Sequence, residues 1–358
     1  MTWMLYGANG YTGELIARLA EKRGERPLLA GRSAEKIAPL AVELGLDHLV
    51  LDLSDGAALR HALADLTLVV HCAGPYAHTA APMVDACLAT GTHYVDLAGE
   101  MDVMEAIYAR HEDAQRAGVV LLPAAGFDVV ATDCLAAMLA AKLPGAVELD
   151  LALTSGGGIS PGTLKSVLQS AGNGGRARVD GVLRQVDLGF RQVVAEFPSG
   201  PRRVTAVPWP DLVSAYRSTG IRTITTYAAI PGSDMLARNP QAQQWLGSLL
   251  RVPAVQRVGA SLVDQFVRGP SQARQASQHT EVWGRVRDGE RHSASGSLTT
   301  PGSYAFTAES VLHAVTRLLA DDPGTARVTP GAHTPSTAFG ADFVKEIEGV
   351  TVSPISTR

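Results

Sequence analysis

Cysteine is scarce in this chain. Among 358 residues there are only three cysteines, Cys72, Cys87 and Cys134, and they lie far apart in the sequence. An odd number at such spacings forms neither a disulfide framework nor a metal-binding motif. Because free thiols persist where the surroundings are reducing, we expect a cytoplasmic protein.

The chain also lacks an excess of one charge and a long apolar run. Its 31 basic and 35 acidic residues leave a net charge of −4, and without a basic stripe we expect no nucleic-acid partner. No apolar stretch reaches the roughly 18 residues that a membrane span needs. An apolar strand begins at Trp3, which predicts no cleaved signal peptide. A composition of 46% hydrophobic and 18% charged residues is typical of a globular protein with two domains.

Signatures of hydrolases and of metal sites are missing as well. The sequence shows no nucleophile–base pair, which argues against a hydrolase. His71 and His78 flank Cys72 and could hold zinc, but a buried strand residue and an exposed loop residue without a metal are the interpretation we favour. We therefore expect no bound metal.

Glycine, by contrast, is plentiful, and three glycines form a turn at the start of the chain. Gly7, Gly10 and Gly13 follow an apolar strand and precede an amphipathic helix. Such a turn aims backbone N–H groups and a helix N-terminus at one point, where a pyrophosphate binds. The alternative is a turn that only packs. The predicted cofactor contacts in this turn are Gly7, Asn9, Gly10, Tyr11, Thr12 and Gly13.

The end of the second strand indicates which dinucleotide binds. About 20 residues past the turn, where NAD-binding proteins carry an acid for the ribose, this chain has Arg32, followed by Ser33 and Lys36. A guanidinium can donate two hydrogen bonds to the 2′-phosphate of NADP, which a carboxylate would repel. The sequence therefore predicts NADP(H), with a solvated arginine at a strand end as the alternative.

Two further strands end in predicted cofactor contacts. Asp52, at the end of the third strand, either binds the adenine amino group or begins a loop. The fourth strand ends in Cys72, Ala73, Gly74 and Pro75, and the nicotinamide half of the cofactor usually lies over this strand.

The pattern of the chain changes near Pro144. Before it, strands and helices alternate, which predicts an α/β fold with a doubly wound parallel sheet of the Rossmann type. After it, period-two runs and an Asp288-Gly289 hairpin turn predict an α+β domain on a mixed or antiparallel sheet. We place the first domain at residues 1–144 and 326–358 and the second at 145–325. The helices predicted in the second domain span residues 160–171, 235–250 and 255–267.

These motifs together resemble the saccharopine dehydrogenase-like NADP-binding oxidoreductases. The resemblance lies in the glycine turn, Ala30-Gly31-Arg32, Cys72-Ala-Gly-Pro-Tyr76, Tyr94-Val-Asp-Leu-Ala-Gly-Glu100, Gly126-Phe-Asp128, Gly162-Thr163 and Thr334-Pro-Ser-Thr-Ala-Phe-Gly340. It implies a Rossmann domain, an inserted second domain, a C-terminal return and often a dimer. The family includes amino-acid dehydrogenases that act on imine adducts and trans-acting enoyl reductases that act on lipid-like polyketide chains.

Candidate chemical groups follow the strand ends. Tyr76 and Asp128 are the candidate catalytic residues: Tyr76 could donate a proton or simply pack, and Asp128 could contact substrate or nicotinamide. Asp96 and Glu100 could bind substrate or cap a helix. Ser160, Thr163 and Lys165, at a predicted helix start, could hold a substrate carboxylate or carbonyl, or belong to a plain capped helix.

The function that this sequence predicts is NADPH-dependent reduction of a C=C or C=N bond in a small-molecule or acyl substrate. The alternative is a non-catalytic NADP-binding sensor or scaffold, which needs the same glycine turn. For a carrier-bound acyl substrate, four arginines could meet an acidic carrier protein, although an ordinary solvated surface is the interpretation we favour. They are Arg176, Arg178, Arg202 and Arg203.

Overall fold

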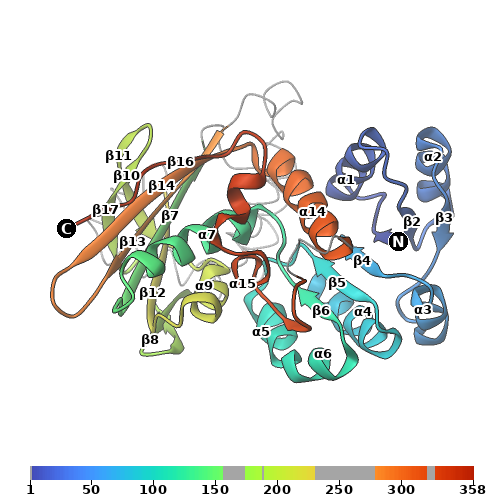
Figure 1. Ribbon diagram of the computed structural model, residues 1–358, viewed down its shortest axis with the longest axis horizontal. Helices are drawn as coiled ribbons and strands as arrows, with labels where there is room; N and C mark the ends of the chain where they lie inside the picture. The colour runs from blue at the N-terminus through green and yellow to red at the C-terminus, as the bar shows by residue number, and fades with distance from the viewer. Residues whose placement is uncertain (1, 156–173, 188, 230–278, 321–326) are drawn as a thin grey trace. The chain divides into compact units, whose positions relative to one another are not determined.

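The computed structural model describes residues 2–155, 174–187, 189–229, 279–320 and 327–358. These residues divide into two compact units (Figure 1). The first consists of Met1–Cys134 and Ser303–Glu348, and the second of Leu135–Gly302 and Gly349–Arg358. The division falls within one helix, α7 (Phe127–Lys142), and the return to the first unit begins with α14 (Ser303–Leu319).

The first unit is built on a seven-stranded sheet in which every neighbouring pair is parallel. Its spatial order is β15 (Gly331–Ala332), β6 (Val120–Leu122), β5 (His93–Asp96), β4 (Leu68–His71), β1 (Trp3–Tyr6), β2 (Leu28–Gly31) and β3 (His48–Val50). Apart from the added β15, this is the strand order of a doubly wound dinucleotide-binding sheet. The predicted fold class of this unit is confirmed.

Helices cover both faces of this sheet, with α1, α2 and α14 on one side and α3 to α6 on the other (Figure 1). The inner strands β1, β2, β4, β5 and β6 are therefore largely buried, which explains their continuous apolar sequences, whereas the edge strand β3 is largely exposed. The helices are α1 (Tyr11–Lys22), α2 (Ala34–Leu44), α3 (Gly56–Leu63), α4 (Tyr76–Thr90), α5 (Met101–Ala109) and α6 (His111–Ala117).

One predicted helix is two in the structure. The sequence pattern from 103 to 117 indicates a single helix, but the chain leaves helical geometry at Arg110, with φ −84° and ψ 13°. The Arg110 guanidinium there donates to Asp85 and Asp113, on α4 and α6. A period-3.6 pattern continues through such a break because both segments bury the same face.

The second unit is a ten-stranded mixed sheet. Its main path runs β10 (Gln192–Phe197), β11 (Gly200–Ala206), β12 (Thr223–Ala228), β7 (Glu148–Ser155), β13 (His279–Arg287), β14 (Ser293–Pro301) and β16 (Thr351–Val352). Its neighbouring strands are antiparallel apart from the parallel pair β12 and β7. The remaining strands are β8 (Gly175–Val179), β9 (Val182–Val186) and β17 (Ser356–Thr357). The predicted mixed or antiparallel sheet and the hairpin of β13 and β14 are confirmed.

Each face of the second sheet has its own core. On one face, Leu135 and Leu139 of α7 pack so closely that a Cβ on Gly284 would lie 2.7 Å from Leu139. On the other face, the buried side chains include Phe197, Tyr227 and Trp283. The sequence analysis missed α9 (Asp211–Thr219) and the hairpin of β8 and β9.

Several predicted elements lie outside the described residues. These are the helices at 160–171, 235–250 and 255–267, together with the candidate residues Ser160, Thr163 and Lys165. In the part of the chain that is described, no helix has the length and apolar character required to cross a membrane.

Candidate functional site

The glycine turn between β1 and α1 is shaped by close backbone contacts. Gly7 has φ +84°, and a Cβ there would lie 2.8 Å from the amide nitrogen of Ala73. A Cβ on Gly13 would lie 2.3 Å from the Gly7 carbonyl oxygen. Both positions therefore require glycine, and the turn is pressed against the loop that follows β4.

The same turn leaves the start of α1 open to an anion. Gly10 is the N-cap residue and has no side chain, so it does not itself cap the first N–H groups of α1. Asn9 and Tyr11, on either side of it, are exposed. A helix N-terminus that begins at a glycine fits a pyrophosphate group, which would bind these amides.

The end of β2 supplies a positive group beside this helix N-terminus. Arg32 is exposed, and it makes no ion pair with any other residue that the structure describes. Ser33 is the N-cap of α2, yet its side chain makes no capping hydrogen bond. Asn9 reaches the same strand end, since a Cβ on Gly31 would lie 2.9 Å from Asn9 Oδ1. These groups fit a second phosphate.

Asp52 lies at the end of the neighbouring strand, and its carboxylate is engaged locally. Oδ1 accepts hydrogen bonds from the amide and the hydroxyl of Ser54, at 2.9 and 2.8 Å. These bonds, together with the more distant Arg32 charge, lower the pKa of Asp52. The loop that Asp52 begins is therefore visible in the structure, and its adenine contact stays a prediction.

Tyr76 begins α4, and its side chain points back toward β4. Its hydroxyl donates to the carbonyl oxygen of His71 at 3.2 Å, and burial raises the pKa of Tyr76 well above its usual value. The Tyr76 amide donates to Glu100 Oε1 at 3.3 Å. Glu100 thus places a negative charge at the N-terminus of α4, a favourable position in the field of the helix.

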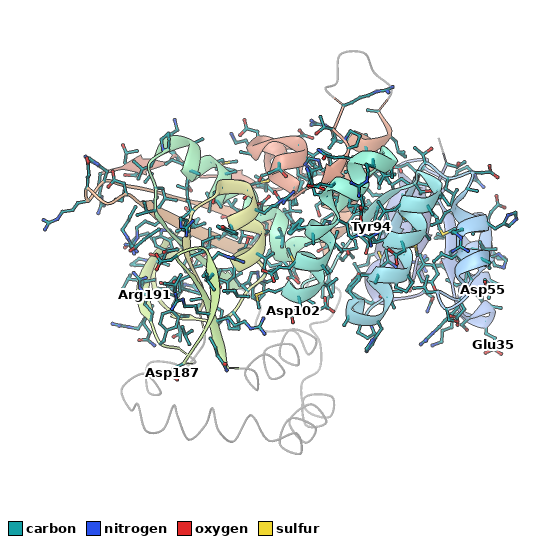
Figure 2. The ribbon with its side chains drawn as sticks, turned by 90° about the horizontal axis from the view of Figure 1, so that it is seen from below. Glu35, Asp55, Tyr94, Asp102, Asp187 and Arg191 are labelled. Carbon is teal, nitrogen blue, oxygen red and sulfur yellow. The ribbon has the colours of Figure 1, made fainter. Side chains whose placement is uncertain are left out.

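Asp96 ties together the loops after β5 and β6. Its carboxylate is fully buried and accepts hydrogen bonds from the Tyr94 hydroxyl at 2.6 Å and from the amides of Ala98 and Ala124 at 2.9 and 2.8 Å. Tyr94 is labelled in Figure 2. Ala124 has φ +58°, a conformation that is unfavourable for alanine, and the bond to Asp96 offsets part of that cost. Burial raises the pKa of Asp96 to about 6, against the effect of these three donors.

Asp128 carries an exposed carboxylate at the edge of the parallel sheet where the strands end. It is the second residue of α7, directly after the loop that Asp96 holds, and its side chain is exposed. Desolvation by the surrounding protein, and secondly the negative charge of Glu100, raise the pKa of Asp128 to about 6. A carboxyl group with this pKa can give up a proton near neutral pH.

His71 is the buried strand residue that the sequence analysis favoured, whereas the contact that α14 makes with the start of α7 was not predicted. His71 is fully buried, neither ring nitrogen has a hydrogen-bond partner, and burial lowers its pKa to about 3. Its position in an apolar strand was the available signal. Thr307 of α14 accepts a hydrogen bond from the Phe127 amide at 3.1 Å. Nothing in the sequence near Thr307 indicates that contact, because it joins residues 180 positions apart.

One grouping of potential metal ligands occurs within the described residues, at the tip of the hairpin of β13 and β14. It consists of Asp288, Glu290 and His292 and is mostly exposed. The Asp288 carboxylate already accepts hydrogen bonds from the amides of the other two residues and lies 2.7 Å from the His292 ring. Internal bonds of the turn therefore account for this grouping.

Comparison with known proteins identifies the first unit. Residues 3–122 match the family model described as the saccharopine dehydrogenase NADP-binding domain. A Mycobacterium tuberculosis protein named provisionally as a trans-acting enoyl reductase is 28% identical over 99% of this chain and 97% of its own length. A rat saccharopine dehydrogenase-like oxidoreductase is 30% identical over 49% of this chain and 47% of its own.

Solved structures show the same fold. The saccharopine dehydrogenase (L-Glu forming) of Saccharomyces cerevisiae superimposes with a TM-score of 0.66 at 14% identity, over 100% of this chain and 99% of its own. A homospermidine synthase of Legionella pneumophila gives 0.63 at 10% identity, over 100% and 91%. Residues 3–122 thus match a saccharopine dehydrogenase-type NADP-binding domain, and the chain as a whole is similar to proteins named as oxidoreductases.

Proposed function

We propose that this protein reduces a C=C bond conjugated to a carbonyl group, with NADPH as the hydride donor and Asp128 as the proton donor. The observation that carries the proposal is the Asp128 carboxyl, exposed at the carboxyl edge of the parallel sheet with its pKa raised to about 6. The name of the Mycobacterium tuberculosis relative, whose similarity spans nearly the whole chain, supports this bond type.

The first unit would hold the coenzyme through groups already in place. The amides at the start of α1, with Asn9 and Thr12, would bind the pyrophosphate. Arg32 and Ser33 would bind the 2′-phosphate, because a guanidinium matches two phosphate oxygens. Cys72, Ala73, Gly74 and Pro75 would lie against the nicotinamide half, at the switch point of the sheet. When bound there, NADPH supplies a hydride.

Asp128 then completes the addition. As the β-carbon of the substrate gains the hydride, its α-carbon takes the proton of the Asp128 carboxyl, and the resulting carboxylate recovers a proton from solvent. Glu100, which binds the Tyr76 amide, keeps a negative charge nearby and so favours the protonated form of Asp128. Tyr76 would form part of the same side of the site, held in place by the hydrogen bond from its hydroxyl to the His71 carbonyl.

A C=N substrate is the second candidate, and the pair of carboxyl groups favours it. Glu100 and Asp128 lie close enough for the Glu100 charge to raise the pKa of Asp128. Two carboxylates at one edge would stabilise a positively charged iminium group, which is a better hydride acceptor than a neutral imine.

The decisive experiment measures NADPH oxidation with enoyl thioesters and with cyclic imines across a pH range. Because the proton donor must be protonated, we expect the rate to fall about tenfold per pH unit above pH 6. Asp128→Asn should lower kcat by about 10²–10⁴-fold and remove the fall in rate above pH 6. An Asp128→Asn enzyme with the activity and profile of the wild type would refute this role. If NADPH is oxidised with neither class of acceptor, the result would favour the alternative of a non-catalytic NADP-binding sensor.

We further propose a homodimer in the cytoplasm that accepts a small-molecule or carrier-bound acyl substrate. The resemblance to the family and the acyl chemistry named for the relative support this. Light scattering of the purified protein measures the oligomeric state, and a comparison of free with carrier-bound enoyl thioesters measures the preference for a carrier.

A further inference from the structure

Two tyrosines from opposite ends of the sequence meet at the start of α1. Tyr11 is the first residue of α1, directly after Gly10, and Tyr304 is the second residue of α14. Their ring centroids are 4.8 Å apart and the rings are nearly perpendicular, at 82°. This is the edge-to-face geometry in which aromatic pairs attract each other.

The position of Tyr304 is fixed by contacts on both sides of its helix. Toward α1, Arg23 forms an ion pair with Glu309. Toward the loop after β6, the Ser310 hydroxyl donates to the Ala125 carbonyl at 2.8 Å, and Thr307 accepts from the Phe127 amide at 3.1 Å. The first half of α14 is therefore held between α1 and the segment that leads into Asp128.

Tyr11 has the placement of a ligand-binding ring. Its side chain is 48% exposed although it packs against Tyr304. A half-exposed ring next to open helix amides offers an apolar face to whatever those amides bind. A ring that served only to join α1 to α14 would gain most by being buried between them. Phe306 of α14 is buried in this way against another helix, at 0% exposure beside Phe127 of α7.

We infer that Tyr304 is a positioning residue for the coenzyme, because it holds the Tyr11 ring against the pyrophosphate–nicotinamide half of the bound dinucleotide. The C-terminal return thus completes a site whose other groups come from the N-terminal 130 residues. This inference rests on dinucleotide binding by the first unit and does not depend on the proposed substrate.

The test is a double-mutant cycle with two ligands in the full-length protein. We expect Tyr304→Ala to raise the Kd of NADPH about three- to tenfold, the loss expected for one aromatic pair. Tyr304→Phe keeps the ring contact and should retain the wild-type Kd. In a Tyr11→Ala background, Tyr304→Ala should add nothing, because its effect passes through Tyr11.

Adenosine 2′-monophosphate separates this role from a general loss of structure. That ligand reaches Arg32 but lacks the pyrophosphate and nicotinamide, so neither tyrosine variant should change its Kd. Arg32→Ala should weaken both ligands, which distinguishes failure of this inference from failure of the predicted 2′-phosphate site. Val42→Ala, which shortens an exposed apolar side chain of α2, is the matched control.

Three results would overturn the inference. They are an unchanged NADPH Kd in Tyr304→Ala, effects of the two tyrosine variants that simply add, and a Tyr304→Phe variant as weak as Tyr304→Ala. If Tyr304→Ala also loses adenosine 2′-monophosphate, the unit is misfolded, and the cycle is then measured with Tyr304→Leu against the same three criteria.

Discussion

Asp150 of the second unit and Arg32 of the first unit are charged side chains with opposite surroundings. In the second unit, Asp150 is buried and is satisfied by the Tyr227 hydroxyl at 2.9 Å and by Arg285 and Arg287 at 2.9 and 3.0 Å. In the first unit, Arg32 is exposed and has no ion-pair partner among the residues that the structure describes. Charges that satisfy one another stabilise a fold, whereas an unpaired charge at a strand end is available to a ligand.

Helix termini in the first unit show the same contrast. Helix α3 is capped by Asp55, whose side chain accepts from the amides of Ala57 and Ala58. Helix α15 (Pro335–Phe339) begins with a capping box formed by Thr334 and Thr337. Helices α1 and α2, which follow the glycine turn and Arg32, have no side-chain cap. Helices α4, α5 and α6 also lack a side-chain cap, so the missing cap alone does not mark a phosphate site. At α1 and α2 it coincides with the glycine turn and Arg32, to which the sequence assigns the phosphates.

The largest effect should come from breaking the buried network of the second unit. Asp150→Ala leaves Arg285 and Arg287 without their shared partner, so we expect a loss of about 3–5 kcal/mol in the free energy of unfolding. Asp187→Ala, an exposed change in the same unit (Figure 2), should cost almost nothing. Urea titration measures both, and equal costs would show that Asp150 is not a stabilising centre.

Removal of the Asp96 carboxylate should have the next largest effect on stability. Asp96→Ala leaves two buried amides and a phenol without their acceptor, a loss of about 2–4 kcal/mol. Asp96→Asn keeps an acceptor and should cost less.

The pH dependence of stability gives Asp96 a second test. Because folding raises the pKa of Asp96 to about 6, folding favours its protonated form. That stabilisation is present in full below the pKa of the unfolded state, near 4, and is lost as pH rises through 6. Relative to Asp96→Asn, the wild type should therefore gain stability between pH 7 and 4. A constant difference in Tm would contradict the raised pKa.

The open charge of the first unit should act on binding instead of stability. Arg32→Ala should weaken NADPH by about 1.5–3 kcal/mol, the contribution of a hydrogen bond to a charged group, and should barely change NADH. Arg60→Ala, another exposed arginine of this unit, is the control. Calorimetric titration measures both coenzymes, and equal losses would mean that Arg32 does not recognise the 2′-phosphate.

The prediction with the smallest expected effect concerns the starts of two helices, α3 and α2. Asp55→Ala removes the cap of α3 and should cost about 0.5–2 kcal/mol of stability. Ser33→Ala removes a side chain that makes no capping bond, so we expect an unchanged Tm and a weaker affinity for NADPH. A similar loss of Tm in both variants would remove the distinction between capped and open helices.

The sequence predicted the parts of this molecule that local patterns determine. The strand, glycine turn and helix at residues 3–22, the Arg32 strand end and the hairpin around Asp288 each follow from neighbouring residues. The fold class followed because strands and helices alternate. Tyr76 and Asp96 were recognised as candidates. The sequence did not show that the Tyr76 hydroxyl points inward or that the Asp96 carboxylate is enclosed, because burial depends on distant segments.

Contacts between remote residues account for what was missed. The packing of α14 against α1, the pairing of Thr307 with Phe127 and the cap that Glu100 gives α4 join segments that lie far apart in the sequence. No single sequence encodes such contacts as a local pattern. The hairpin of β8 and β9 escaped notice because its second strand is largely exposed and has a weak apolar pattern.

A crystal structure with NADP⁺ bound measures the central claim most directly. The account predicts the pyrophosphate at the amides that begin α1 and the 2′-phosphate within hydrogen-bond distance of the Arg32 guanidinium. A coenzyme bound elsewhere, or one whose 2′-phosphate is held by other side chains while Arg32 points into solvent, would contradict it.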